Sequence, residues 1–116
     1  MTLLLKKKCL PVTVDSLPLD TATIEGYLKD LGLSWSLDNQ SIIKKNFAFS
    51  SFNAALKFLE EVAELAKLEN HHPAMLIDYK KVTIFITSHR VKGLTENDFI
   101  LAAKIDAIFL TFHEKS

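Results

Sequence analysis

Hydrophobic residues recur with the period of an α-helix in three parts of the chain, which predicts three helices. These parts are about residues 21–31, 52–69 and 96–112. Gly32 follows the first segment, where a helix usually ends, and Pro73 prevents the second from running on. Thr95-Glu96-Asn97-Asp98 is a capping-box pattern that opens the third helix.

Hydrophobic and polar positions alternate between these helices, and this alternation predicts four strands. The strands cover about residues 35–37, 42–49, 75–79 and 82–88. Asp38-Asn39-Gln40 and Lys80-Lys81 are short turn segments, so each pair of strands is expected to form an antiparallel hairpin. The predicted fold class is α+β, a four-stranded antiparallel sheet with helices packed on one face. The order is helix-strand-strand-helix-strand-strand-helix.

The first 18 residues show neither pattern and contain Pro11 and Pro18. We expect residues 1–18 to be a loose N-terminal leader and residues 19–116 to form a single domain. Cys9 is the only cysteine, so no internal disulfide is possible. We interpret Cys9 as an incidental residue of this leader rather than as a nucleophile.

No hydrophobic run is long enough to span a membrane. The leucines at positions 3–5 precede the lysines at positions 6–8, which reverses the order of a secretory signal. We therefore expect a cytoplasmic protein that does not bind membranes.

The formal net charge of the 116 residues is +0, so the chain lacks the basic footprint of a nucleic-acid-binding protein. Zero net charge also gives little repulsion between copies of the chain. Residues 52–66 carry two hydrophobic rows, and residues 99–110 are hydrophobic on nearly all sides. This exceeds what a small core needs, so we expect a homo-oligomer.

Three of the four histidines, His71, His72 and His89, lie around the second predicted hairpin. Histidine exchanges protons near neutral pH, which favours acid–base chemistry. Taken alone, His71-His72 would be interpreted as residues that cap the carbonyls at a helix C-terminus. His89 favours acid–base chemistry over this capping interpretation. It ends a predicted strand, and strand ends are where a small fold can bring side chains together. A zinc site is the alternative, but neighbouring histidines on extended backbone diverge and no cysteine accompanies them. We expect no metal.

The spacing Lys67, His71-His72-Pro73, Tyr79, His89 and Asp98 resembles the signature of the pterin-4a-carbinolamine dehydratase family. The alternating residues 43–49 and 82–86 and the segment Gly93-Leu94-Thr95 also resemble that family. The resemblance covers roughly residues 19 to 112. It implies the α+β fold above and subunits that associate as dimers or as dimers of dimers.

The implied reaction is dehydration of a 4a-hydroxytetrahydropterin to the quinonoid dihydropterin, without a cofactor. Aromatic amino acid hydroxylases produce this carbinolamine and are possible partners. The resemblance implies that His71, His72 and His89 are catalytic, with His72 as the main proton-transfer group. Pro73, Ser88, His89 and Arg90 would bind the pterin. Three further residues would contact the site residues without touching the substrate: Asp98, Lys67 and Tyr79. Asp98 would orient a histidine while it caps its helix.

Lys67 stands where other family members carry a glutamate that could orient a histidine. A cation there is expected to disfavour protonation of neighbouring histidines, with Glu64 or Glu69 as compensating acids. The alternative function is a non-catalytic binding module or accessory subunit. The resemblance extends to a dimerisation cofactor of a homeodomain transcription factor, and a role in another pathway, such as that of the molybdenum cofactor, remains open. The intact histidine set favours chemistry.

Overall fold

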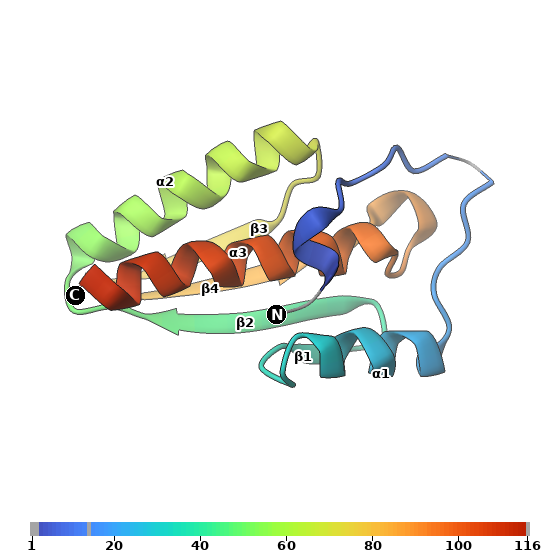
Figure 1. Cartoon of the computed structure of the whole chain (residues 1–116), viewed down its shortest axis with the longest axis horizontal. Coiled ribbons are helices and arrows are strands. Elements are labelled where there is room, and N and C mark those ends of the chain that lie inside the picture. The colour runs from blue at the N-terminus through green and yellow to red at the C-terminus, as the bar shows by residue number, and fades with distance from the viewer. Residues whose placement is uncertain (1–2, 14, 116) are drawn as a thin grey trace.

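The computed structural model describes residues 3–13 and 15–115, and the side chains of these residues up to Phe112. Its elements are η1 (Leu3–Lys6), α1 (Thr21–Asp30), β1 (Ser36–Asp38), β2 (Ile42–Ala48), α2 (Phe52–Glu69), β3 (Ala74–Asp78), β4 (Lys81–Ile86), η2 (His89–Val91) and α3 (Glu96–Lys115). The sheet is antiparallel with the strand order β1-β2-β4-β3. Helices α2 and α3 lie side by side across it (Figure 1). The predicted α+β fold class is confirmed.

The core lies between the sheet and the helices. Val82, Ile84 and Ile86 of β4 are fully buried, because alternate residues of a strand share one face. Five phenylalanines from β2, α2, α3 and the residue after β2 form a cluster of ring contacts, with members Phe47, Phe49, Phe58, Phe109 and Phe112. Burial of such large apolar side chains is the main stabilising contribution to a small domain.

Helix α3 is hydrophobic on nearly all sides because other parts of the same chain surround it. It packs against α2 and η1, and Phe99, Leu101 and Ile105 are fully buried. Much of the hydrophobic surface that the sequence assigned to subunit contacts is therefore used within the chain. On α2 the core face is the row with Phe58 and Val62, which leaves Phe52 and Leu56 exposed.

The expected loose leader is wrong for residues 3–10. Leu4 lies in the hydrophobic core, and Cys9 is also buried. Figure 1 shows η1 lying across α3. Cys9 and Leu10 form hydrogen bonds with Glu69 and Asn97, which lie far away in the sequence. The hydrophobic residues of this segment were too few and too irregular to show a helical or strand period.

Two boundaries in the second hairpin also differ from the prediction. Tyr79 and Lys80 form the turn, and β4 begins at Lys81, because Tyr79 takes a left-handed backbone conformation. β4 ends at Ile86, so His89 lies in η2 rather than at the end of a strand. Within the described residues, no helix combines the length and hydropathy needed to cross a membrane.

Gly93 holds the loop after η2 close to the segment before α1. A Cβ atom added at Gly93 would lie 2.8 Å from Cβ of Pro18, whose ring cannot rotate away. We expect Gly93→Ala to destabilise the fold by about 1–3 kcal/mol through overpacking. Gly26→Ala is the matched control, because nothing lies within 4 Å of its added Cβ. Urea unfolding compares each variant with the wild type, and a Gly93→Ala protein as stable as the wild type would contradict the expectation.

Candidate active site

The C-terminus of α2 fixes the position of the two adjacent histidines. Asn70 adopts a left-handed conformation with φ 53°. The amide of Asn70 donates to the carbonyl of Lys67, and the amide of His71 donates to the carbonyl of Ala66. This pair of hydrogen bonds is a Schellman motif, which ends the helix and turns the chain toward β3. His71 is thereby held one residue beyond the helix cap.

A buried carboxylate holds the ring of His71. Nε2 of His71 lies 2.6 Å from Oδ1 of Asp98, whose side chain is 0% exposed. Oδ2 of Asp98 accepts hydrogen bonds at 2.8 Å from the Ser88 hydroxyl and from the Thr95 amide. Because the Ser88 hydroxyl donates its only proton to Asp98, the Thr95 hydroxyl donates to Ser88 Oγ, also at 2.8 Å. Asp98 thus caps α3 and orients His71 at the same time.

The segment after β4 brings His89 to the same end of the sheet. Ser88 and Gly93 form an isolated antiparallel bridge, in which the Ser88 amide donates to the Gly93 carbonyl at 3.0 Å. This bridge closes a short loop that contains η2, with Lys92 in a left-handed conformation at its end. His89 and Arg90 are exposed on this loop, and Ser88 is buried beneath it.

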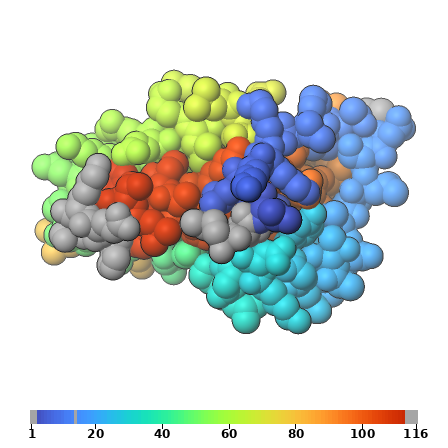
Figure 2. Space-filling model, in the orientation of Figure 1, coloured from blue at the N-terminus to red at the C-terminus, as the bar shows by residue number. Residues whose placement is uncertain are grey.

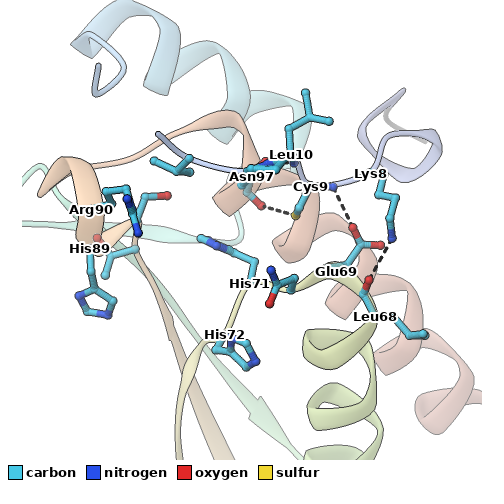
Figure 3. Close-up of a pocket in the computed structure, with 15 residues that line it drawn as sticks. Lys8, Cys9, Leu10, Leu68, Glu69, His71, His72, His89, Arg90 and Asn97 are labelled. Carbon is cyan, nitrogen blue, oxygen red and sulfur yellow. Dashed lines mark hydrogen bonds between the residues drawn. The ribbon is translucent and has the colours of Figure 1, made fainter. Parts of the chain in front are cut away.

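A cleft of about 630 Å³ lies between these segments, and all three predicted catalytic histidines line it. Ser88 and Arg90 line it as well. Figure 3 shows His71 between the chain near Asn97 on one side and His72 on the other, with His89 and Arg90 across the cleft. In the described part of the chain, the rings of His72 and His89 make no hydrogen bond. Both rings are exposed and accessible to a ligand.

Lys67 and Tyr79 lie outside the cleft. The Lys67 side chain is 70% exposed and pairs with Glu64 at 3.1 Å, so solvent separates its charge from the histidines. Tyr79 is 66% exposed in the turn at the far end of β3, where Lys80 lies over its ring. The supporting roles predicted for these two residues therefore lack a structural basis. Pro73 follows His72 and leads into β3 but is not part of the cleft wall.

The sequence interpretation missed one whole wall of the cleft. Residues 8–12, together with Glu69 and Asn97, line it opposite the loop that carries His89. Asn97 was assigned only to the capping box of α3, and residues 8–12 to a loose leader. The hydrogen bonds of this segment join residues far apart in the sequence, so no local pattern indicated that it packs against the domain.

Glu69 joins this wall to the helices. Its buried carboxylate accepts hydrogen bonds from the Cys9 amide at 2.8 Å and from Lys104 Nζ at 2.5 Å. Burial alone would raise the pKa of Glu69. The hydrogen bonds from Lys104 and Cys9 and the charge of Lys104 outweigh it and hold the pKa below its usual value. Glu69 is therefore an ionised structural anchor two residues before His71. No group of three or more His, Cys, Asp or Glu side chains placed to hold a metal ion occurs among the described residues.

The Cys9 thiol is expected to be unreactive toward alkylating agents in this environment. Burial, followed by the charge of Glu69, raises the pKa of the Cys9 thiol to about 12. Only the thiolate attacks alkylating agents, so at pH 8 we expect iodoacetamide to react with the folded protein at least ~10²-fold more slowly than with the protein unfolded in urea. Mass spectrometry of the time course measures both rates. Equal rates would show that Cys9 is accessible and ionisable.

Comparison with known proteins identifies the family of the chain. The family model described as pterin 4 alpha carbinolamine dehydratase matches residues 17–108. The chain belongs to this family. The resemblance seen in the sequence is thereby confirmed.

Bacterial relatives assigned the name pterin-4-alpha-carbinolamine dehydratase match nearly the whole chain. The relative from Alkaliphilus metalliredigens is 37% identical over 91% of this chain and 96% of its own. The relative from Halorhodospira halophila is 41% identical over 88% of this chain and 94% of its own.

Two solved structures share the fold. A transcriptional coactivator/pterin dehydratase from Brucella melitensis has a TM-score of 0.74 at 29% identity, covering 78% of this chain and 97% of that one. A pterin dehydratase-like protein described as a RuBisCO assembly factor in the alpha-carboxysome has a TM-score of 0.57 at 26% identity. That match covers 66% of this chain and 89% of that one.

Proposed function

We propose that this protein is a hydro-lyase that dehydrates a 4a-hydroxytetrahydropterin to the quinonoid dihydropterin and water. The observation that carries the proposal is the convergence of His71, His72 and His89 on one cleft, with the ring of His71 held by the buried Asp98. Family membership supports the substrate class.

The reaction needs an acid and a base in one site. Hydroxide is a poor leaving group, so the oxygen on C4a must gain a proton as its bond to carbon breaks. The ring nitrogen bonded to that carbon loses a proton as the new double bond forms. A group that titrates near the working pH does either task best, and each task contributes ~10²–10⁴-fold to the rate.

The geometry suggests different tasks for the three histidines. His72 and His89 have exposed rings without hydrogen bonds among the described residues, so they can exchange protons with a ligand and with water. We assign the main proton transfer to His72 and the second one to His89. The ring of His71 is held by Asp98, so it serves as a fixed donor or acceptor that orients the pterin. Ser88 and Arg90 would complete the binding surface.

Turnover of the carbinolamine by purified protein tests this function. The carbinolamine can be generated in the cuvette by an aromatic amino acid hydroxylase with tetrahydrobiopterin, and its decay can be followed by ultraviolet absorbance. We expect a decay rate that rises in proportion to protein concentration. A rate equal to the spontaneous one at every concentration would refute the proposal. Such hydroxylases are also the class of enzyme that we propose supplies the substrate, in the cytoplasm.

The second candidate function is a non-catalytic binding module. The similarity to a coactivator/pterin dehydratase and to a RuBisCO assembly factor favours it, because both descriptions include work on protein partners. Absence of turnover with an intact fold would place this function first.

We further infer that the protein is a homodimer or homotetramer. Phe52 and Leu56 are exposed one turn apart on α2, and Leu76 is exposed on β3. Neighbouring exposed hydrophobic side chains, such as Phe52 and Leu56, are typical of subunit contacts. Sedimentation at micromolar concentration is expected to show a dimer or tetramer, and Phe52→Glu with Leu56→Glu is expected to weaken it. A monomeric wild type would contradict the inference.

A further inference from the structure

The segment from Lys7 to Val12, here called the N-terminal arm, is tied to the end of α2. Nζ of Lys8 donates to the carbonyl of Leu68 at 2.9 Å, and the amide of Cys9 donates to the Glu69 carboxylate at 2.8 Å. Leu68 and Glu69 are the last two residues of the helix that presents His71. The arm and the histidine pair are thus connected through one helical turn.

The arm is also tied to the start of α3, through the side chain of Asn97. The amide of Leu10 donates to Oδ1 of Asn97 at 2.9 Å, and Nδ2 of Asn97 donates to the carbonyl of Leu10 at 2.6 Å. One side chain thus pairs with both main-chain groups of Leu10, as a neighbouring strand would. The Cys9 thiol donates to the Asn97 carbonyl at 3.5 Å, and both residues are buried. These contacts make the segment a fixed part of the domain.

The arm faces the histidines across the cleft. Residues 8–12 line the same cleft as His71, His72 and His89, and Figure 3 shows the arm running along one side of it. Pro11 and Val12 make no hydrogen bond with the rest of the described chain. Their main-chain groups are therefore available to a ligand, and a pterin carries hydrogen-bond donors and acceptors along its ring edge.

The N-terminal segment is packed on the surface of the folded domain. In Figure 2 the N-terminal segment lies against the helices instead of projecting from them. The arm also precedes the residues matched by the family model, which begin at residue 17.

We propose that the N-terminal arm is a wall of the substrate site that holds the pterin ring against His71 and His72, and that Asn97 is the positioning residue that keeps the arm in place. The identity of the ligand rests on the proposed function. A wall that contacts the substrate before and during the reaction contributes to binding in both states. Its loss therefore raises KM and leaves kcat nearly unchanged.

Asn97→Ala tests the role of the clamp, with Asn46→Ala as the matched control. Asn46 accepts a hydrogen bond from the Thr83 hydroxyl at 2.7 Å on the sheet, away from the cleft. For Asn97→Ala we expect KM for the carbinolamine to rise roughly tenfold, with kcat within about twofold of wild type, as for the loss of one or two hydrogen bonds. The Kd of 7,8-dihydrobiopterin, a stable pterin that is not turned over, is expected to rise equally. Asn46→Ala is expected to change neither constant.

Hydrogen exchange of the wild-type protein gives a measurement that does not depend on the variant folding. We expect 7,8-dihydrobiopterin to slow amide exchange in the peptide that contains residues 8–12, because the ligand would lie against it. A purely structural arm would show no such change. The inference is overturned if the ligand leaves exchange in the arm unaltered, or if a folded Asn97→Ala protein keeps wild-type KM and Kd.

The possible outcomes test the role of the arm and the dehydratase activity independently. Turnover by the wild type together with an unresponsive arm would overturn the inference alone. Binding of dihydrobiopterin with protection of the arm but without turnover would overturn the dehydratase proposal and support the arm as a pterin-binding wall. A wild-type protein that neither turns over nor binds a pterin would overturn both.

Discussion

Replacing His72 or His89 by alanine is expected to slow carbinolamine dehydration by ~10²-fold or more, as for loss of a general acid or base. Both rings line the cleft, are exposed and have no hydrogen-bond partner among the described residues. Their removal leaves no buried group unsatisfied, so the fold is expected to survive. Rates of carbinolamine decay and thermal unfolding followed by circular dichroism measure the two effects separately.

His113→Ala provides the matched control for these variants. His113 is the remaining histidine and belongs to the last turn of α3, whereas the site is built at the other end of that helix. It is expected to keep the wild-type rate. If His72→Ala and His89→Ala also kept that rate with intact folds, acid–base catalysis by these histidines would be wrong. The binding-module function would then be preferred.

The hydrophobic periodicities were enough to predict the fold class. The strand residues Val82, Ile84 and Ile86 alternate in the sequence because one face of β4 is buried, so the pattern and the burial have the same cause. The period could not identify which hydrophobic row of α2 faces the core. Phe52 and Phe58 are chemically equivalent in the sequence, and only packing against the other phenylalanines selects Phe58.

The part of the site that depends on local motifs could be predicted from the spacing of residues in the sequence. His71 and Asp98 are 27 positions apart, and their contact depends on the Schellman turn at Asn70 and the capping box at Thr95, both of which are local. The arm could not be predicted in this way. Its hydrogen bonds with Glu69 and Asn97 join segments that lie far apart in the sequence, and no local pattern encodes them.

Lys67 shows the opposite case, in which the sequence predicted a role in the site that the structure does not support. Its place in the signature predicted an influence on the histidines, but a side chain on the solvent face of α2 points away from them. Its pairing with Glu64 on the preceding turn is a surface interaction of small energy. A position within a motif therefore does not by itself show that its side chain reaches the site.

Replacing Asp98 is expected to have a larger effect on stability than any histidine variant. As a helix cap alone, this residue would contribute ~0.5–2 kcal/mol. The structure adds two further donors, because the His71 ring and the Ser88 hydroxyl also point at its carboxylate. Asp98→Ala leaves these groups and the Thr95 amide without an acceptor in the protein interior. Each such group costs ~1–3 kcal/mol, so we expect a loss of about 3 kcal/mol or more.

Asp98→Asn separates orientation from stability. Asparagine has nearly the same shape, but one of its two terminal atoms is a donor. It can therefore no longer accept from every donor that Asp98 satisfies. With the amide nitrogen facing Nε2, the His71 ring must move its proton to Nδ1 or turn away. We expect kcat to fall ~10–10²-fold, a larger fractional effect than the accompanying loss of stability explains.

Asp106→Asn is the matched control for Asp98→Asn. Asp106 also accepts hydrogen bonds through both oxygens, from Trp35 at 3.0 Å and from Lys45 at 2.8 Å, but it lies outside the cleft. The Asp106→Asn substitution is expected to lower the unfolding temperature while kcat stays at the wild-type value. Steady-state kinetics and thermal unfolding of both variants decide the matter. An Asp98→Asn protein with wild-type kcat would mean that the hydrogen bond from His71 serves only the fold, and His71 would then lose its place among the residues that orient the pterin.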